Sequence, residues 1–216
     1  MLDIFFSNQM WHLILGGLRA TVLIFVFAAA LAFLIGAALT YMKITHRLQW
    51  LFKPLYWFIK TIHDVPALAL MMFFYYVVFA GRMNGIIVTV IALGVYTSGS
   101  LVKLFTHHIQ QVDEGQIEAG LSLDMTMRQC YRHIVLPQAY DSMRLFLASE
   151  LKTLLRATSY AGYIAQKDLM DAVHQIEEVH PGSVLPLVIA SILYLLLSWL
   201  ITVTVNFIYV KLFRHD

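Results

Sequence analysis

Three long apolar stretches constrain the fold of this chain more than any other feature. Residues 20–42, 84–102 and 179–210 are 23, 19 and 32 residues long and contain no Asp, Glu, Lys or Arg. A helix needs about 20 mostly apolar residues to cross the hydrocarbon core of a bilayer. Hydrophobic residues make up 60% of the chain, above the roughly 45–50% of soluble domains. We therefore predict an all-α, polytopic membrane protein surrounded by lipid.

A fourth span is predicted at residues 60–81. Its apolar part, residues 67–81, is too short to cross alone, so the helix must extend back through His63, Asp64 and Pro66. We expect these residues to make the start of the span polar and kinked, because proline lacks an amide hydrogen. The preceding segment, residues 47–60, mixes tryptophan and tyrosine with basic residues. This mixture is typical of a segment at the membrane interface, with its basic residues toward the cytoplasm.

The positions of the basic residues predict five spans. Lysine and arginine concentrate in residues 43–60, 103–156 and 211–214, and cytoplasmic loops carry an excess of both. All three segments can be cytoplasmic only if a semi-polar fifth span precedes the last apolar stretch. Twelve of the fifteen Lys and Arg then face the cytoplasm, with the N-terminus periplasmic and the C-terminus cytoplasmic. The predicted spans are 18–42, 60–81, 84–104, 143–165 and 184–210.

The semi-polar span carries Glu150, Lys152 and Arg156. Charged residues at membrane depth are costly and usually face a bundle interior or a wet cavity. Alternatively, the helix starts late and the two basic side chains reach the interface along their aliphatic stems. Glu150 is too short to reach the interface in this way, so a functional or pairing role is favoured for it.

A polar insert at residues 112–138 lies between the predicted spans at residues 84–104 and 143–165. Asp113 with Gln116, and Thr126 with Gln129, have the spacing of helix-capping boxes. The residues between, 123–125, predict a turn. Pro137 is expected to end the second helix at or before Leu136. We therefore predict two short helices joined by a tight turn, which are too small for a core of their own and must dock on something.

One motif in this insert resembles a known signature. Permease subunits of ATP-binding-cassette importers carry E-A-A, three residues, G, nine residues, I, any residue, L-P. The same spacing occurs here at Glu118-Ala119-Gly120, Asp124, Ile134, Leu136 and Pro137, preceded by Gly115-Gln116.

Further residues resemble the polar amino-acid branch of that family. Pro137-Gln138-Ala139 matches its P-Q-A, and a later segment matches at Glu150, Leu154, Leu155, Thr158 and Ser159. The resemblance covers most of the chain, from Gly17 to the tail.

The resemblance implies one permease domain over residues 1–216 with the type I importer transmembrane fold. It implies that residues 112–138 are a coupling hairpin held in a groove of a cytoplasmic ATPase dimer. The expected coupling residues are Gly115, Gln116, Glu118, Ala119, Gly120, Asp124, Ile134, Leu136 and Pro137. The expected location is the bacterial inner membrane, and the expected partners are a second permease subunit and an extracytoplasmic solute-binding protein.

The chain lacks a G-x-x-x-x-G-K-[ST] phosphate loop. ATP hydrolysis is therefore expected on a separate subunit, and neither enzyme activity nor a cofactor is expected here. His107 and His108 point about 100° apart on a helix and rarely chelate a metal together, so no metal site is predicted. A net charge of +2 says little about partners, and no nucleic-acid partner is expected.

The chain departs from the family pattern at several positions. Asp124 replaces a turn glycine, and Gly120 replaces a helix-favouring alanine, which predicts a hairpin that is either looser than usual or shaped for its own ATPase. Lys103 and Leu70 replace an acidic residue and a glutamine respectively. These two departures predict a heterodimeric pore in which a more typical sister subunit supplies the standard polar contacts.

The expected substrate is a polar amino acid, and Glu150 would suit a basic one, although glutamine or an opine remains open. Candidate residues on the translocation path are Pro66, Ser100, Lys103, Glu150, Arg156, Thr158 and Ser159. Thr158 and Ser159 lie where the helix could break and expose backbone groups to substrate. Ser100 and its neighbours could instead bond to nearby backbone. The alternative function is a proton- or ion-coupled transporter that titrates Glu150, Asp64 or Lys103; a membrane enzyme ranks last.

Overall fold

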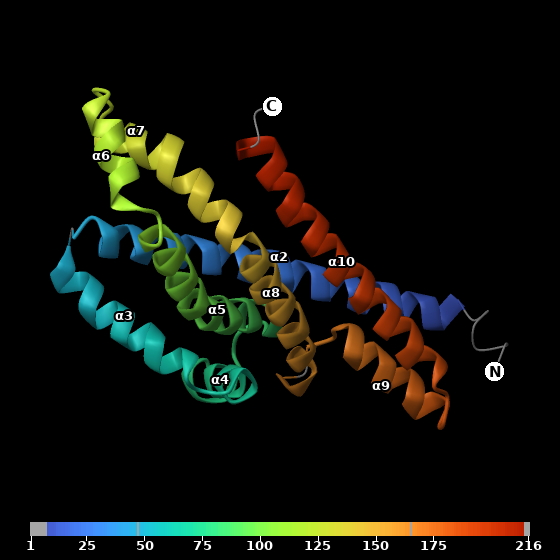
Figure 1. The fold of residues 1–216 in the computed structure, drawn as a ribbon. Coiled ribbons are helices and arrows are strands. Elements are labelled where there is room, and N and C mark those ends of the chain that lie inside the picture. Colours follow the sequence, from blue (N-terminus) through green and yellow to red (C-terminus); the bar gives the residue numbers. More distant parts are fainter. Residues whose placement is uncertain (1–7, 47, 165, 214–216) are drawn as a thin grey trace.

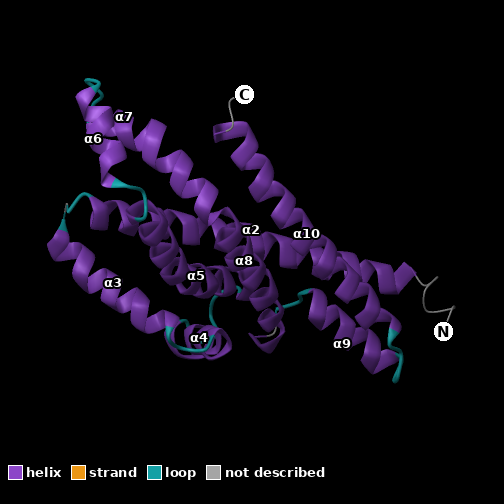
Figure 2. Ribbon diagram, viewed as in Figure 1, coloured by secondary structure: helices purple, strands orange, loops and turns teal. Residues whose placement is uncertain are grey.

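A computed structural model of the chain describes residues 8–46, 48–164 and 166–213. All regular elements in these residues are helical, as predicted (Figure 2). Parts of the predicted topology, namely both chain ends and the last residue of the 143–165 span, lie outside the described residues.

Three described helices are long and apolar enough to cross a membrane. They are α2 (Asn8–Ile44), α5 (Gly85–Gln110) and α10 (Leu185–Phe213). Each contains or matches one of the apolar stretches, although α2 begins ten residues before the predicted start at residue 18. α2 packs along α5, and a Cβ on Gly94 of α5 would lie 2.8 Å from Leu31 Cδ2 of α2. The small residue thus permits close packing of the two helices.

The segment predicted as a span at 60–81 is divided in the structure. α3 (Gln49–His63) ends before Asp64, and α4 (Ala67–Phe73) continues into a π-helical turn at Phe74–Val78. The two parts are bent by 111°, far more than a kink. The break follows from Pro66, which cannot donate a backbone hydrogen bond and disfavours helical geometry at Val65.

The hairpin consists of α6 (Glu114–Ser122) and α7 (Met127–Cys130). The prediction that Pro137 ends the second helix is wrong. The chain instead passes through a π-helical turn at Tyr131–Val135 into α8 (Leu136–Ala157). Pro137 lies in the first turn of α8, where its missing N–H would have no helical acceptor in any case. A wider π turn immediately before it absorbs the steric demand of the ring.

α8 ends in a 3-10 turn at Thr158–Ile164, and α9 (Leu169–Val179) follows before α10. The start of α2 packs on α9 and α10 through a cluster that includes Met10, Ile14 and Val173. Figure 1 shows α9 beside the N-terminal end of α2, and the α6–α7 hairpin at the other end of the molecule. The α6–α7 hairpin and α9 are therefore separated by the length of the helical bundle.

Candidate functional site

Side-chain caps fix both arms of the hairpin. The Oδ1 atom of Asp113 accepts a hydrogen bond from the Gly115 amide at 2.8 Å. Thr126 and Gln129 form the predicted capping box, in which the Thr126 amide donates to Gln129 Oε1 at 2.8 Å. Each cap satisfies an amide that the helix leaves unpaired, so the ends of both arms are well defined.

The turn between the arms has the predicted position and an unusual backbone. Asp124 adopts a left-handed conformation with φ of 58°. The amide of Asp124 donates to the Leu121 carbonyl at 3.1 Å, and the Met125 amide donates to the Gly120 carbonyl at the same distance. A family glycine at this position would adopt such a conformation without strain.

Gly120 lies at the closest contact between the arms. A Cβ at this position would lie 2.8 Å from Cys130 Sγ and 2.9 Å from Ile134 Cδ1. Helix propensity alone predicts that Gly120 loosens the hairpin. The contact shows a different role, because the missing side chain lets α6 lie directly on α7 and the turn that follows.

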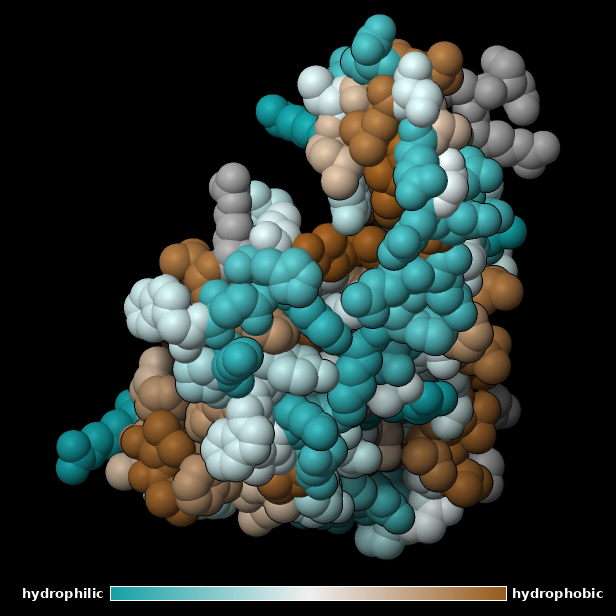
Figure 3. Space-filling model, turned by 60° about the vertical axis from the view of Figure 1, so that its left-hand side comes forward, coloured by the Kyte–Doolittle hydropathy of each residue, from teal (hydrophilic) through white to brown (hydrophobic). Residues whose placement is uncertain are grey.

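The coupling-motif residues divide into a packed set and an exposed set. Gly120 is buried, while Ile134 and Pro137 are half-buried. Figure 3 shows the hairpin projecting from the body of the protein, with apolar patches among hydrophilic ones. Leu123 at the turn is 77% exposed. The exposed set comprises Gly115, Gln116, Glu118, Ala119, Asp124 and Leu136.

A polar face runs along α8 and the 3-10 turn that follows it, in the predicted span at residues 143–165. Ser149, Thr153, Arg156 and Tyr160 recur every three or four residues and are all exposed. Arg156 Nη2 donates to Thr153 Oγ1 at 3.0 Å. In the described residues the one ion pair joins Arg144 to Asp141, so Glu150, Lys152 and Arg156 have no ionic partner there. A polar face of this kind needs a partner or a wet cavity beside it.

The structure brings His63 to a candidate path residue, Ser100. The Nε2 atom of His63 lies 3.4 Å from Ser100 Oγ, and its Nδ1 atom lies 3.1 Å from the Tyr96 carbonyl oxygen. A Cβ on Gly99 would lie 2.9 Å from the His63 Cβ. Sequence reasoning missed His63, and the signal that could have found it is the chain break that follows it.

The other candidate path residues are not gathered into one pocket. Lys103 and Pro66 are exposed, and Glu150 is half-buried and interacts electrostatically with Tyr96. At Thr158, where the sequence suggests that the helix could break, α8 passes directly into the 3-10 turn. The hydroxyl groups of Thr158 and Ser159 donate to the carbonyls of Leu155 and Arg156, both at 2.7 Å. These hydroxyls therefore bond to local backbone.

A buried junction at the opposite end of the molecule was not predicted. Asp168 is fully buried and caps α9, its Oδ1 atom accepting from the Asp171 amide at 2.8 Å. The Leu169 amide donates to Thr21 Oγ1 at 3.1 Å. A Cβ on Gly17 would lie 2.5 Å from the Asp168 carbonyl oxygen. The start of α9 is therefore seated on the backbone of α2.

No ion pair to the Asp168 carboxyl group occurs among the described residues. Its Oδ2 atom and the Tyr194 hydroxyl oxygen are both buried without a hydrogen-bond partner among the described residues. The Tyr194 hydroxyl faces Thr21 and Thr158, but neither contact has the geometry of a hydrogen bond. Burial is the main reason that the pKa of Asp168 rises to about 6, because a low-dielectric environment disfavours the charged form.

No cluster of three or more His, Cys, Asp or Glu suited to a metal ion occurs in the described residues. The candidate functional features are a polar helix face, a projecting hairpin and a buried carboxyl group.

Comparison with known proteins gives consistent matches. The family model for the inner membrane component of binding-protein-dependent transport systems matches residues 32–215. A Bacillus subtilis (strain 168) protein named "Probable glutamine ABC transporter permease protein GlnM" is 30% identical over 95% of both chains. The arginine transport system permease protein ArtQ of the same organism is 24% identical over 88% of this chain and 87% of its own.

Solved structures agree with the fold. A crystal structure of an amino acid ABC transporter with histidines has a TM-score of 0.77 at 23% identity, covering 94% of this chain and 96% of its own. The MetNI methionine ABC transporter in an inward-facing conformation has a TM-score of 0.76 at 17% identity, covering 95% of this chain and 99% of its own. At these identities the likeness concerns the fold.

Proposed function

The chain belongs to the family of inner membrane components of binding-protein-dependent transport systems, and from this membership we propose that it imports a polar amino acid as the permease subunit of an ATP-driven transporter. The observation that carries the proposal is the projecting α6–α7 hairpin, which presents the family motif on a rigid support. The named relatives are permeases for glutamine and arginine, which favours an amino-acid substrate.

The proposed topology has five crossings in the bacterial inner membrane, with the N-terminus periplasmic and the C-terminus cytoplasmic. α2, α5 and α10 form three of them. The bent α3–α4 pair forms a fourth, with its break inside the membrane region. The 22 residues of α8 and the seven residues of its 3-10 extension form the fifth, a length sufficient for a crossing.

Coupling is proposed to take place at the hairpin. Its exposed residues, among them Glu118, Ala119 and Leu123, contact a groove of a separate cytoplasmic ATPase. The buried Gly120 contact and the capping box hold the arms together. A rigid hairpin transmits a rigid-body movement of the ATPase into α5 and α8, whereas a loose loop would absorb it.

The transport path is proposed to run along the polar face of α8 and the adjoining face of α5. Glu150, Arg156, Ser100 and Lys103 lie on these faces. A second, more typical permease subunit would close the path from the other side and provide partners for the unpaired charges. An extracytoplasmic binding protein delivers the substrate at the α9 end.

Uptake in proteoliposomes tests this proposal. The permease is reconstituted with its sister subunit, ATPase and binding protein, and amino-acid uptake is followed with and without ATP. We expect uptake to require ATP, and Glu118→Arg to abolish both uptake and co-purification of the ATPase. Glu178→Arg on α9 makes the same charge change at the other end and should leave the ATPase bound.

A different result would overturn the proposal. Uptake by this chain alone, driven by a proton gradient and unaffected by Glu118→Arg, would identify a secondary transporter. In that case Glu150, Asp64 and Lys103 become the titrating groups to examine.

A further inference from the structure

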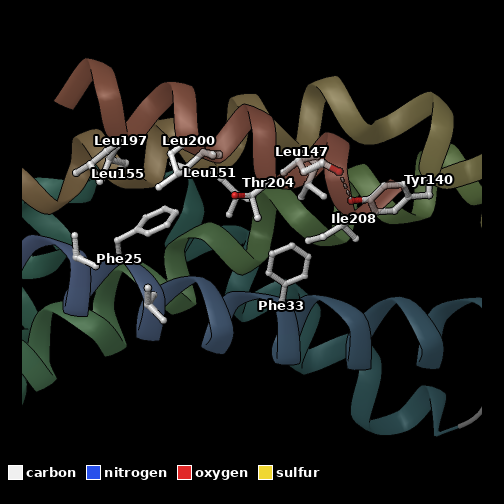
Figure 4. Close-up of a pocket in the computed structure, with 14 residues that line it drawn as sticks. Phe25, Phe33, Tyr140, Leu147, Leu151, Leu155, Leu197, Leu200, Thr204 and Ile208 are labelled. Carbon is white, nitrogen blue, oxygen red and sulfur yellow. Dashed lines mark hydrogen bonds between the residues drawn. The ribbon is translucent and has the colours of Figure 1, made fainter. Parts of the chain in front are cut away.

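An apolar groove lies between α2, α8 and α10. Its volume is about 360 Å³, and Phe25, Leu151 and Ile201 are among its lining residues. Figure 4 shows Leu197 and Leu155 at one end of the groove, with Tyr140 and Ile208 at the other. From Leu197 to Ile208 the wall formed by α10 is about 17 Å long at 1.5 Å per residue. This length is close to half of the roughly 30 Å hydrocarbon core, which is the depth of one leaflet.

The groove faces away from the polar side of the molecule. On α8 the lining residues Leu147, Leu151 and Leu155 lie about 170° around the helix from the polar face of Ser149, Thr153 and Arg156. A second permease subunit or a wet path is needed on the polar face. The groove on the opposite side is therefore left open to the lipid.

One end of the groove carries positive charge. Arg144 shares the groove face of α8 with Tyr140, and its guanidinium carbon lies 4.6 Å from the centre of the Tyr209 ring. Its Nε atom pairs with Asp141 at 3.5 Å, which leaves its terminal N–H groups available. Lys211 is exposed about one turn beyond Ile208 on α10. Both residues lie toward the hairpin end of α8 and the C-terminal end of α10, which is the cytoplasmic end in the proposed topology.

We propose that this groove binds an anionic phospholipid of the cytoplasmic leaflet, with one acyl chain between α2, α8 and α10 and its phosphate at Arg144 and Lys211. The inference rests on the topology of the proposed function. A tail that enters the groove exchanges one hydrocarbon environment for another, so the groove selects for shape and the basic residues select the headgroup. Arginine suits this role because its planar donors match phosphate oxygens.

Native mass spectrometry of the purified importer complex tests the site. The complex is stripped of lipid and then offered an equal mixture of phosphatidylglycerol and phosphatidylcholine. We expect retained phosphatidylglycerol to exceed phosphatidylcholine. Arg144→Gln should reduce retained phosphatidylglycerol about fivefold, the effect of one basic residue near an anionic headgroup, without changing phosphatidylcholine. Arg144→Lys should restore the preference in part.

Two substitutions of equal size test the groove itself. Thr204 lines the groove, whereas Val203 beside it is 42% exposed and is not among the lining residues. Thr204→Phe should fill the groove and reduce retention of both lipids at least fivefold, while Val203→Phe should leave retention unchanged. Equal effects of the two variants, or equal retention of the two lipids, would overturn the proposal. Dissociation of the permease subunits by Thr204→Phe alone would do so too, because the groove would then be a protein interface.

Uptake measured on the same preparations separates this inference from the proposed function. ATP-driven uptake without retained phosphatidylglycerol would refute the lipid site and leave the importer function intact. Retained phosphatidylglycerol without ATP-driven uptake would refute the importer function and leave the lipid site intact.

Discussion

A glycine lies at a close contact at each end of this protein, but different groups occupy the space beside the two glycines. At the hairpin, Gly120 admits the ends of two side chains, Cys130 and Ile134. At the α2–α9 junction, Gly17 admits the backbone of Asp168 and Leu169. Side-chain ends can rotate away from an added methyl group, whereas the backbone at the start of a capped helix cannot. An added methyl group should therefore be tolerated better at Gly120 than at Gly17.

The two ends also treat charge differently. The hairpin keeps its charged groups on the surface, where Glu118 and Arg128 are exposed. The junction buries Asp168, which forms no ion pair among the described residues. A buried, unpaired carboxyl group costs free energy in its charged form. The stability of the junction should thus depend on pH.

The largest effect is expected from Gly17→Ala. Its Cβ would lie 2.5 Å from the Asp168 carbonyl oxygen, so α9 must separate from α2. We expect the free energy of unfolding to fall by more than about 3 kcal/mol, at the upper end for overpacking. The measurement is a lower thermal midpoint in detergent. Gly16→Ala is the control, since nothing lies within 4 Å of its added Cβ. Equal midpoints for the two variants would show that the junction is as adaptable as the hairpin.

The next largest effect is expected from Asp168→Asn and depends on pH. The ordinary pKa of 3.8 rises to about 6 in the folded protein. Between these values the folded state keeps a proton that the unfolded state has lost, so stability falls as pH rises from about 4 to about 6. The fall should be up to about 3 kcal/mol, at 1.36 kcal/mol per pKa unit.

The asparagine side chain of this variant keeps the oxygen that caps α9 and carries no charge. The variant should match the wild-type protein near pH 4 and exceed it near pH 7, in thermal melts across this range. A wild-type melting temperature that rises from pH 4 to pH 6 would contradict a neutral buried Asp168.

A smaller effect is expected from Gly120→Ala. The added methyl group would lie 2.8 Å from Cys130 Sγ. Because the Cys130 side chain can rotate, the free energy of unfolding should fall by only about 1–2 kcal/mol. Cys130→Ala in the same chain should recover most of that loss, because it removes the sulfur atom. The measurement is ATPase co-purification together with thermal stability. If the double variant were no better than Gly120→Ala alone, the contact with Cys130 would not be the reason for the glycine.

The sequence predicted the hairpin in more detail than the junction for a physical reason. The hairpin forms from residues 113–135, so its caps, turn and left-handed Asp124 follow from local rules. Pro137 was misjudged because a π-helical turn, which has no simple sequence signal, absorbs it. The junction joins Gly17, Thr21, Asp168 and Tyr194, which are far apart in the chain. No local pattern shows that their helices meet. The contact between His63 and Ser100 was missed for the same reason, because the two residues are far apart in the chain.

The smallest effect is expected from Asp124→Gly, which introduces the glycine of the motif that the hairpin resembles. Asp124 has a φ of 58°, and a left-handed conformation costs a non-glycine residue about 1 kcal/mol. Glycine relieves this strain but has more freedom when unfolded, so the net gain should be below about 1 kcal/mol. Asp113→Gly is a useful contrast, because Asp113 accepts a hydrogen bond from Gly115 and its loss should destabilise the same arm. Thermal stability of the two variants should therefore move in opposite directions, and an equal decrease would mean that the Asp124 side chain stabilises the turn in a way that backbone strain does not explain.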